Sequence, residues 1–162
     1  MQTRSDISLA QWALISAFRE GSIHTLDLPR IAREDFGLGG VEFVNTLFEV
    51  PTQRYLDELK NNLAAYKVKP VLIMVDDEGD GCSATEQGRK QFVINHRKWI
   101  DIAVYLGCDA IRTNCRGKNT DHSSEALKYA AASYHMLLEY AESSGINVLI
   151  ENHGGFSNQA NW

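Results

Sequence analysis

The sequence has few cysteines, and their spacing is not that of a cross-linked or metal-bound framework. Its three cysteines, Cys82, Cys108 and Cys115, form no Cys-x-x-Cys pair, and an odd number cannot be fully paired within one chain. This pattern excludes a small disulfide-rich scaffold and does not indicate a cysteine-based metal cluster. We expect reduced thiols that are buried in the fold.

The sequence also lacks an excess of basic residues and a long apolar run. Its 16 lysines and arginines are outnumbered by 21 aspartates and glutamates, which gives a formal net charge of −5. No basic stripe is available to neutralise phosphates, so we expect no nucleic acid partner. No segment is long and apolar enough to span a membrane, and residues 1–6 contain no apolar signal-peptide region. We therefore expect a soluble, cytoplasmic protein with no membrane partner, although a signal peptide removed beforehand would leave no trace here.

What the sequence does contain is a regular alternation of short apolar runs and longer amphipathic segments. With 162 residues, of which 44% are hydrophobic, it can bury one sizeable core. Five short runs are predicted as strands: Ile7–Trp12, Val41–Asn45, Val71–Val75, Ala110–Asn114 and Val148–Ile150. The segments predicted as helices are 28–36, 52–66, 83–106 and 122–144. Alternating strands and helices predict an α/β fold with a parallel sheet, and no linker divides residues 1–162, which we expect to form a single domain.

The most informative stretch is the last predicted strand and the residues that follow it. Three apolar residues are followed directly by Glu151, Asn152, His153 and two glycines. Alternation along the strand places Glu151 and His153 on one face. Enzymes of the α/β class carry their catalytic groups at the carboxyl ends of buried parallel strands. We interpret Glu151 and His153 as site residues; the alternative is that they only mark the return of the chain to water.

Residues in the other predicted strands are further candidates. Arg112 and Asn114 share a face near a strand's carboxyl end, which suits the binding of an anion or of hydroxyl groups. Glu42 lies inside an apolar run, and we expect it to point into a polar interior. Trp12 could form the floor of a pocket or be ordinary core. Arg112 could also pair with Glu42 or Glu151 to neutralise the interior, and the two roles are compatible.

Two other polar features are interpreted as structural. Residues 76–81 hold four carboxylates directly after the run Val71–Val75, but they lack the ligand spacing of an EF-hand. We expect a solvated acidic loop there rather than a cation site. His96 lies on the apolar stripe of the predicted helix 83–106, so we expect it to pack in the core rather than to bind a ligand.

Several of these segments, taken in order, resemble the sugar phosphate isomerase/epimerase family. The matching segments are Ile7–Trp12, Ile31–Gly37, Val41–Asn45, His96–Trp99, Leu106–Cys108 and Glu151–Gly155. The resemblance implies the xylose-isomerase-like (β/α)8 barrel and a divalent metal, Mn, Mg, Co or Zn, held by carboxylates and a histidine. It also implies that Glu151 is a metal ligand that moves the substrate proton through a metal-stabilised enediolate. The residues that would surround a sugar or sugar phosphate are Trp12, Glu42, Arg112, Asn114 and His153.

The chain is shorter than this resemblance requires. A complete (β/α)8 barrel needs about 250 residues, so we expect an incomplete TIM barrel of about five strands. The remaining metal ligands would then be missing, and this chain alone would be inactive. Two open sheet edges predict a homo-oligomer or aggregation. Two other functions stay open: a metal-dependent phosphodiesterase like the AP endonucleases, and a non-catalytic half-barrel used for binding or assembly.

Overall fold

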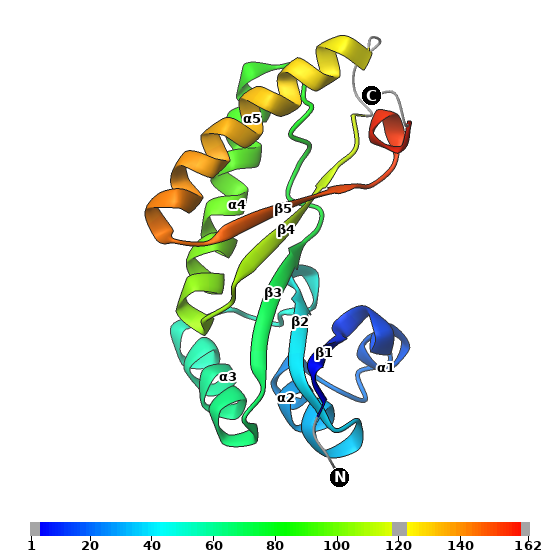
Figure 1. Ribbon diagram of the computed structural model, residues 1–162, viewed down its shortest axis with the longest axis vertical. Coiled ribbons are helices and arrows are strands. Elements are labelled where there is room, and N and C mark those ends of the chain that lie inside the picture. The colour runs from blue at the N-terminus through cyan, green and yellow to red at the C-terminus, as the bar shows by residue number, and fades with distance from the viewer. Residues whose placement is uncertain (1–3, 118–122, 160–162) are drawn as a thin grey trace.

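The computed structural model describes residues 4–117 and 123–159, in which five strands alternate with helices (Figure 1). The strands are β1 (Arg4–Ala10), β2 (Leu38–Val44), β3 (Lys69–Val75), β4 (Ala110–Cys115) and β5 (Asn147–Asn152). They form one sheet in the order β1-β2-β3-β4-β5, and every neighbouring pair is parallel. The predicted α/β fold with a parallel sheet is therefore confirmed.

Three long helices lie along one side of the sheet (Figure 1). They are α3 (Gln53–Tyr66), α4 (Glu86–Leu106) and α5 (Ser123–Ser144). Thr52 caps α3 as expected, because its side chain accepts a hydrogen bond from the Tyr55 N–H. The α4 helix begins later than predicted because its cap is Thr85, whose hydroxyl accepts from the Gly88 N–H at 3.1 Å. His122, the predicted start of the last helix, lies outside the described residues.

The predicted end of the first strand, Trp12, is wrong. β1 stops at Ala10, and residues Gln11–Leu14 form a 3-10 helix that leads into α1 (Ile15–Arg19), which was not predicted. The cause is the buried side chain of Gln11. It accepts from the Val44 N–H at 2.5 Å and donates to Thr25 at 3.0 Å, which fixes the chain where it leaves the sheet. Trp12 therefore lies in a turn beyond the strand.

The predicted helix 28–36 is also irregular. It consists of a 3-10 turn (Thr25–Asp27), the short α2 (Leu28–Arg30) and a π-helical turn (Ile31–Asp35). Two further 3-10 turns, Asn45–Leu47 and Gly155–Asn158, follow β2 and β5. Pro29 at the beginning of α2 agrees with the expectation of a helix start, since proline is favoured in the first turn.

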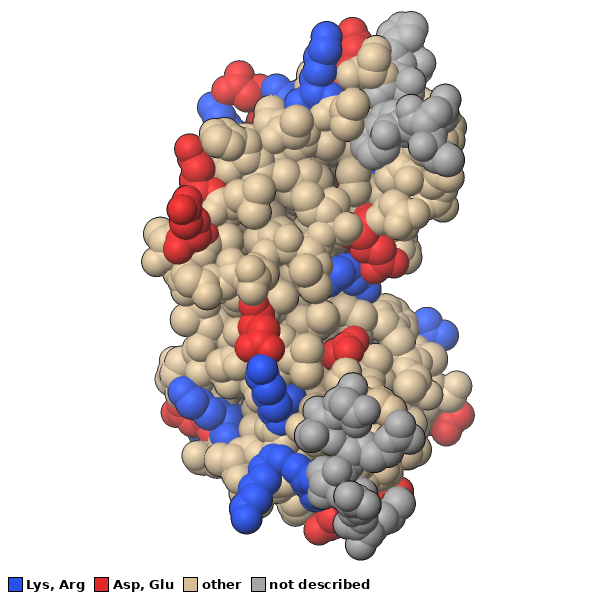
Figure 2. All heavy atoms as spheres, in the orientation of Figure 1, with Lys and Arg blue, Asp and Glu red and all other residues tan. Residues whose placement is uncertain are grey.

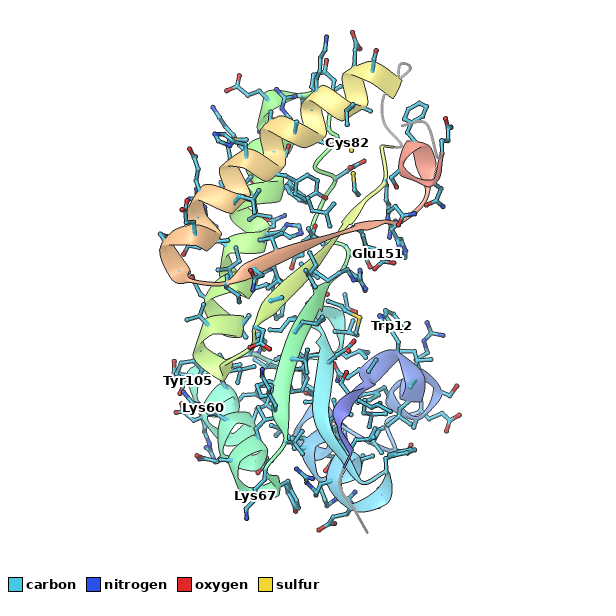
Figure 3. The ribbon with its side chains drawn as sticks, in the orientation of Figure 1. Trp12, Lys60, Lys67, Cys82, Tyr105 and Glu151 are labelled. Atoms are coloured by element: carbon cyan, nitrogen blue, oxygen red, sulfur yellow. The ribbon has the colours of Figure 1, made fainter. Side chains whose placement is uncertain are left out.

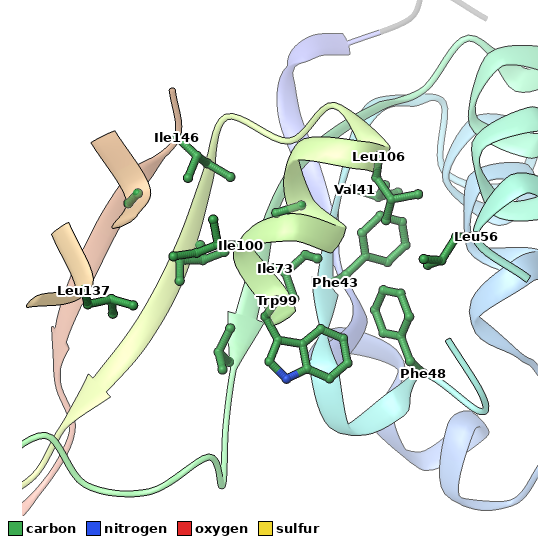
Figure 4. Packing of buried hydrophobic residues seen from close by; sticks show 14 of the residues in the cluster. Val41, Phe43, Phe48, Leu56, Ile73, Trp99, Ile100, Leu106, Leu137 and Ile146 are labelled. Atoms are coloured by element: carbon green, nitrogen blue, oxygen red, sulfur yellow. The ribbon is translucent and has the colours of Figure 1, made fainter. Parts of the chain in front are cut away.

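The hydrophobic core lies between the sheet and its helices (Figure 4). Phe43, Ile73 and Ile111 project from three adjacent strands and are fully buried. Trp99 of α4 packs edge-on against Phe48, with ring centroids 5.5 Å apart. Because side chains alternate along a strand, these residues fix the orientation of the whole sheet. The intervening positions of each strand consequently point to the opposite face, where the polar residues lie.

Among the described residues, no helix is both long and apolar enough to cross a membrane.

β1 and β5 are the two edge strands of the sheet among the described residues. Within the described residues, β1 and β5 each pair on one side only, and Leu149 and Ile150 of β5 are about half exposed. Unpaired edge groups beside apolar side chains favour association, so we expect the 162-residue chain to self-associate in sedimentation velocity. Ile150→Lys should weaken this association, whereas Leu127→Lys on α5 should not. A monodisperse species of 18.2 kDa would contradict the prediction.

Candidate functional site

A cluster of polar side chains gathers at the carboxyl ends of β3, β4 and β5, and Arg112 is its centre. Its Nη1 donates to Asp76 Oδ1 at 2.8 Å, and its Nε donates to Glu151 Oε2 at 2.9 Å. The same Nη1 donates to Asn114, whose Nδ2 donates to Asp76 Oδ1 at 2.7 Å. Arg112 and Asp76 are only 12% and 13% exposed, so this ion pair is largely shielded from water.

The sheet register explains why these residues meet. Arg112 lies opposite Met74 on one side and Leu149 on the other, and Asn114 lies opposite Glu151. Residues separated by two positions share a face, so Met74 and Asp76 point the same way as Arg112 and Asn114. The prediction that Arg112 and Asn114 share a face is confirmed.

The backbone of Asp76 is fixed from the neighbouring strand. Asn45 is buried directly after β2, and its amide donates to the Asp76 carbonyl at 2.9 Å. The Asp76 N–H donates to Asn45 Oδ1 at 2.7 Å. The expectation of a solvated acidic loop is therefore wrong for Asp76, because Arg112, Asn114 and Asn45 hold it at the edge of the sheet.

Glu151 and His153 lie together at the end of β5. His153 Nδ1 is 3.0 Å from Glu151 Oε1, so the two carboxylate oxygens of Glu151 face different partners, His153 and Arg112. The next residue, Gly154, has φ +91°, a left-handed conformation that suits glycine. It starts the turn in which the His153 N–H donates to the Ser157 hydroxyl at 3.0 Å. Glu151 is 41% and His153 46% exposed, so both remain accessible to a ligand.

A cavity of about 210 Å³ adjoins this cluster. Its lining residues come from the carboxyl ends of all five strands: Trp12, Thr46, Asp76, Asp77, Arg112, Arg116 and His153. Figure 3 shows Trp12 and Glu151 on opposite sides of this region, and Figure 2 shows a notch at the same edge of the molecule. Trp12 is 40% exposed, which leaves part of its ring free for contact. The structure thus brings Trp12, Arg112 and His153 into one cavity, with Asn114 and Glu151 behind and beside them.

Glu42 lies apart from this cavity. It is half-buried on the same face of the sheet, as the alternation of β2 predicts, and it accepts a hydrogen bond from the Ser8 hydroxyl at 2.5 Å. Of the two partners considered for Arg112, the structure shows Glu151 and not Glu42. Any contact between Glu42 and a substrate stays a prediction.

The charges of the cluster favour a neutral or cationic ligand over an anion. One guanidinium, Arg112, faces two carboxylates, Asp76 and Glu151. Asp77 and Arg116, which also line the cavity, balance each other. The resulting excess of one negative charge is spread over oxygens that can accept hydrogen bonds from hydroxyl groups.

The described residues around Glu151 supply too few ligands for the divalent metal that the family resemblance implies. One of the Glu151 oxygens faces Arg112, which cannot bind a metal, and the other faces His153, which can. In residues 4–117 and 123–159, no group of three or more His, Cys, Asp or Glu side chains is placed to hold a metal ion. Catalytic zinc sites use three protein ligands, so the described residues alone do not form such a centre.

His96 is a structural residue, as predicted. It is 1% exposed, its Nδ1 lies 2.8 Å from the Phe92 carbonyl, and its Nε2 lies 3.0 Å from the Thr113 hydroxyl. The first contact requires a proton on Nδ1, which leaves Nε2 as the acceptor of the Thr113 proton. The imidazole therefore ties α4 to β4 directly behind Asn114, and burial lowers the pKa of His96 below its ordinary value of 6.5.

This burial predicts a pH dependence of stability. In the unfolded chain His96 takes up a proton near pH 6.5, whereas in the folded chain, where burial lowers its pKa, it does so only at lower pH. The free energy of unfolding should therefore fall as the pH drops below 6.5, by at most about 1.4 kcal/mol per pH unit. His96→Gln should remove this part of the slope in urea titrations, whereas His135→Gln, at an exposed position, should not. An identical slope in wild type and His96→Gln would contradict the prediction.

Sequence reasoning missed several residues of the site. Asp76 could have been found, because it continues the alternation of Leu72 and Met74 along β3. Thr46 and Arg116 follow strand ends without a distinguishing pattern, so the sequence offers no signal for them. Asn45 was placed at the end of a strand, but its role in holding Asp76 depends on a contact between loops.

The chain is similar to one known protein family and to several solved structures. The family model for the xylose isomerase-like TIM barrel matches residues 31–161. No curated protein sequence matches the chain. A D-tagatose 3-epimerase-like protein has a TM-score of 0.69 and 20% identity, covering 90% of this chain and 52% of that one. The IolI protein with a bound zinc atom has a TM-score of 0.66 and 14% identity, and the match covers 90% of this chain and 50% of that one. An AP endonuclease of family 2 from Brucella melitensis has a TM-score of 0.61 and 19% identity, and the match covers 80% of this chain and 50% of that one.

These similarities define the fold and the family. The chain spans about half the length of each of the three solved structures, and its five parallel strands with their helices match part of a TIM barrel. At identities of 20% or less the structural likeness shows the fold alone. Because the family model covers most of its residues, the chain belongs to the xylose isomerase-like TIM barrel family.

Proposed function

We propose that this chain carries part of the active site of a sugar isomerase or epimerase, in which the excess negative charge of the cluster favours a neutral sugar over a sugar phosphate. The observation that carries the proposal is the placement of Glu151, an accessible carboxylate oriented by Arg112 and His153 beside the cavity. The D-tagatose 3-epimerase-like neighbour supports the same class of reaction. A positioned carboxylate can take a proton from the carbon next to a sugar carbonyl and return it, which is the chemistry of isomerisation and epimerisation.

Each side chain of the cluster has a chemical role in this proposal. Glu151 accepts the proton, and the Arg112 guanidinium, whose Nε lies 2.9 Å from Glu151 Oε2, holds the carboxylate in its orientation. Asp76 and Asn114 hold Arg112 in place from its other side. Trp12 offers an apolar ring for the C–H face of a sugar, while His153 can bind a hydroxyl group. The approach of one ring and several polar groups from different strand ends matches a polyhydroxylated ligand.

Exchange of the substrate proton with solvent tests this proposal. The natural polypeptide, supplied with divalent metal, is incubated with keto-sugars and their phosphates in D₂O. We expect deuterium at the carbon next to the carbonyl, detected by NMR, because a proton held on Glu151 exchanges with solvent. An absence of exchange with all keto-sugars and metals tried would refute this function.

Metal dependence belongs to the proposal as a prediction. The IolI neighbour holds a zinc atom. A carboxylate and an imidazole, as in Glu151 and His153, can both be ligands of a divalent metal, and the affinity differs among Mn, Mg, Co and Zn. Because the described residues offer no third ligand beside Glu151 and His153, we expect only weak binding when the 162-residue chain is titrated with Mn²⁺. Tight, stoichiometric binding would contradict this account of the donor set.

A phosphodiesterase acting on DNA is the second candidate. It is favoured by the structural likeness to the AP endonuclease from Brucella melitensis. The charge distribution argues against it, because the net charge is −5 and acidic and basic residues are interspersed on the face drawn in Figure 2. Cleavage of DNA containing an abasic site would favour this candidate, and a chain that neither cleaves DNA nor exchanges protons would be a binding or assembly module.

A further inference from the structure

Two buried cysteines from different parts of the chain lie in contact behind the site. Cys82 is in the loop between β3 and α4, and Cys115 is the last residue of β4. Their sulfur atoms are 3.6 Å apart, and the two residues are 0% and 5% exposed. We infer that Cys82 and Cys115 form a reversible disulfide when the protein meets a small peroxide oxidant.

The backbone around both cysteines is fixed, so the contact is built into the fold. The Cys82 N–H donates to Asp80 Oδ1 at 2.9 Å, and the adjacent Gly81 carbonyl accepts from Ser133 of α5 at 2.6 Å. The Cys115 carbonyl accepts from the His153 N–H at 3.0 Å. A disulfide bond is about 2.05 Å long, so rotation of the side chains with a small backbone adjustment must bring the sulfurs about 1.5 Å closer.

Cys108 is the natural comparison within the chain. It precedes β4, whereas Cys115 ends that strand, and a rise of roughly 3.3 Å per residue separates them by about 20 Å. Two cysteines can be joined only if their Cα atoms are within about 7 Å. Cys108 therefore cannot take the place of Cys82 within one folded chain.

The environment also favours the chemistry of oxidation. The Cys82 thiol lies within hydrogen-bonding distance of Cys115 and lowers the pKa of the Cys115 thiol, which favours the reactive thiolate there. A cavity of about 340 Å³ is lined by Asp80, Asn114 and Arg116, which lie within two residues of the cysteines in sequence, but neither cysteine lines it. Hydrogen peroxide therefore reaches the buried sulfurs from this cavity only through a local opening of the chain around them.

The reaction proceeds in two balanced steps. The Cys115 thiolate attacks one oxygen of hydrogen peroxide, the O–O bond breaks, and the hydroxide released takes up a proton to give water and a sulfenic acid. The Cys82 sulfur then displaces the sulfenic oxygen, which leaves as a second water together with the Cys82 proton. Overall, two thiols and one peroxide yield one disulfide and two waters.

Oxidation would tie the acidic loop to the strand that carries the site. The loop after β3 begins at Asp76, and Cys115 directly follows Asn114, so the new bond links two segments that already meet at Arg112. The inference concerns the thiols alone and holds whether or not the proposed sugar chemistry is correct.

Peptide mapping of the peroxide-treated protein tests the inference. The protein is exposed to hydrogen peroxide, alkylated and digested with trypsin, which separates the three cysteines because Arg89, Arg112 and Arg116 divide them among three peptides. We expect a mass loss of about 2 Da, a linked Cys82–Cys115 peptide pair, and recovery of both thiols with dithiothreitol. The melting temperature of the oxidised chain should rise by roughly 5 °C, since a cross-link restricts the unfolded chain.

Cysteine variants supply the controls. Cys82→Ser and Cys115→Ser should each abolish the mass loss, whereas Cys108→Ser should retain it. The wild-type peptide map decides the question even if a variant fails to fold. Linkage through Cys108, disulfides between two chains, or overoxidation to sulfinic acid without any linked peptide would overturn the inference.

Discussion

Replacing Glu151 by glutamine should lower the rate of proton exchange into a keto-sugar by roughly 100- to 10,000-fold, the usual contribution of a general base. Glutamine has nearly the same shape, and its amide oxygen can still accept from Arg112 Nε, which is 2.9 Å from Glu151 in the wild type. An amide, however, cannot take up a proton at neutral pH. The fold should consequently survive while the chemistry is lost, which separates a catalytic role from a structural one.

The matched control is Glu139→Gln on α5. Glu139 is exposed on α5, and its side chain contacts His135 one helical turn away. Neither residue belongs to the Arg112 cluster. We expect wild-type exchange in this variant and a similar melting temperature in both. If Glu151→Gln exchanges protons within about twofold of wild type, Glu151 is not the base, and the proposed function loses its main support.

The sheet could be predicted from sequence because its signals are local. Each strand is a short apolar run between helix-ending and helix-starting residues, and alternation assigns its two faces without any knowledge of neighbours. Prediction failed where a tertiary contact decides the backbone. Gln11 ends β1 by forming hydrogen bonds with Val44 and Thr25. No sequence pattern indicates that these three residues meet.

In the candidate site, too, the residues with local signals could be predicted, and those that depend on tertiary contacts could not. Arg112, Asn114, Glu151 and His153 could be proposed as site residues from the sequence, because they lie near strand ends and alternation places each pair on one face. Asp76 was misjudged, because four carboxylates within five residues suggest a solvated loop until Arg112 is placed beside one of them. A buried ion pair between adjacent parallel strands depends on register, and register is set by the packing of the whole sheet.

Replacing Arg112 by methionine should lower the free energy of unfolding by roughly 3 kcal/mol, because removal of one partner leaves a buried charge unpaired. Asp76 is 13% exposed, and among the described residues it would keep only the Asn114 amide as a side-chain donor. Glu151, at 41% exposed, would be resolvated at much lower cost. Urea denaturation monitored by tryptophan fluorescence measures the difference.

Two further variants identify the cause of this loss. The double variant Arg112→Met with Asp76→Asn also removes the shielded carboxylate that Arg112 neutralises, so the combined loss should be smaller than the sum of the single losses. Lys69→Met breaks a pair of similar geometry, Lys69 with Asp109 at 2.5 Å, whose side chains are both more than half exposed. Because water screens that pair, its loss should cost less than about 1 kcal/mol. Equal losses in Arg112→Met and Lys69→Met would mean that the Arg112 cluster is no more stabilising than a surface ion pair, and its position beside Glu151 would then have to be explained by ligand binding alone.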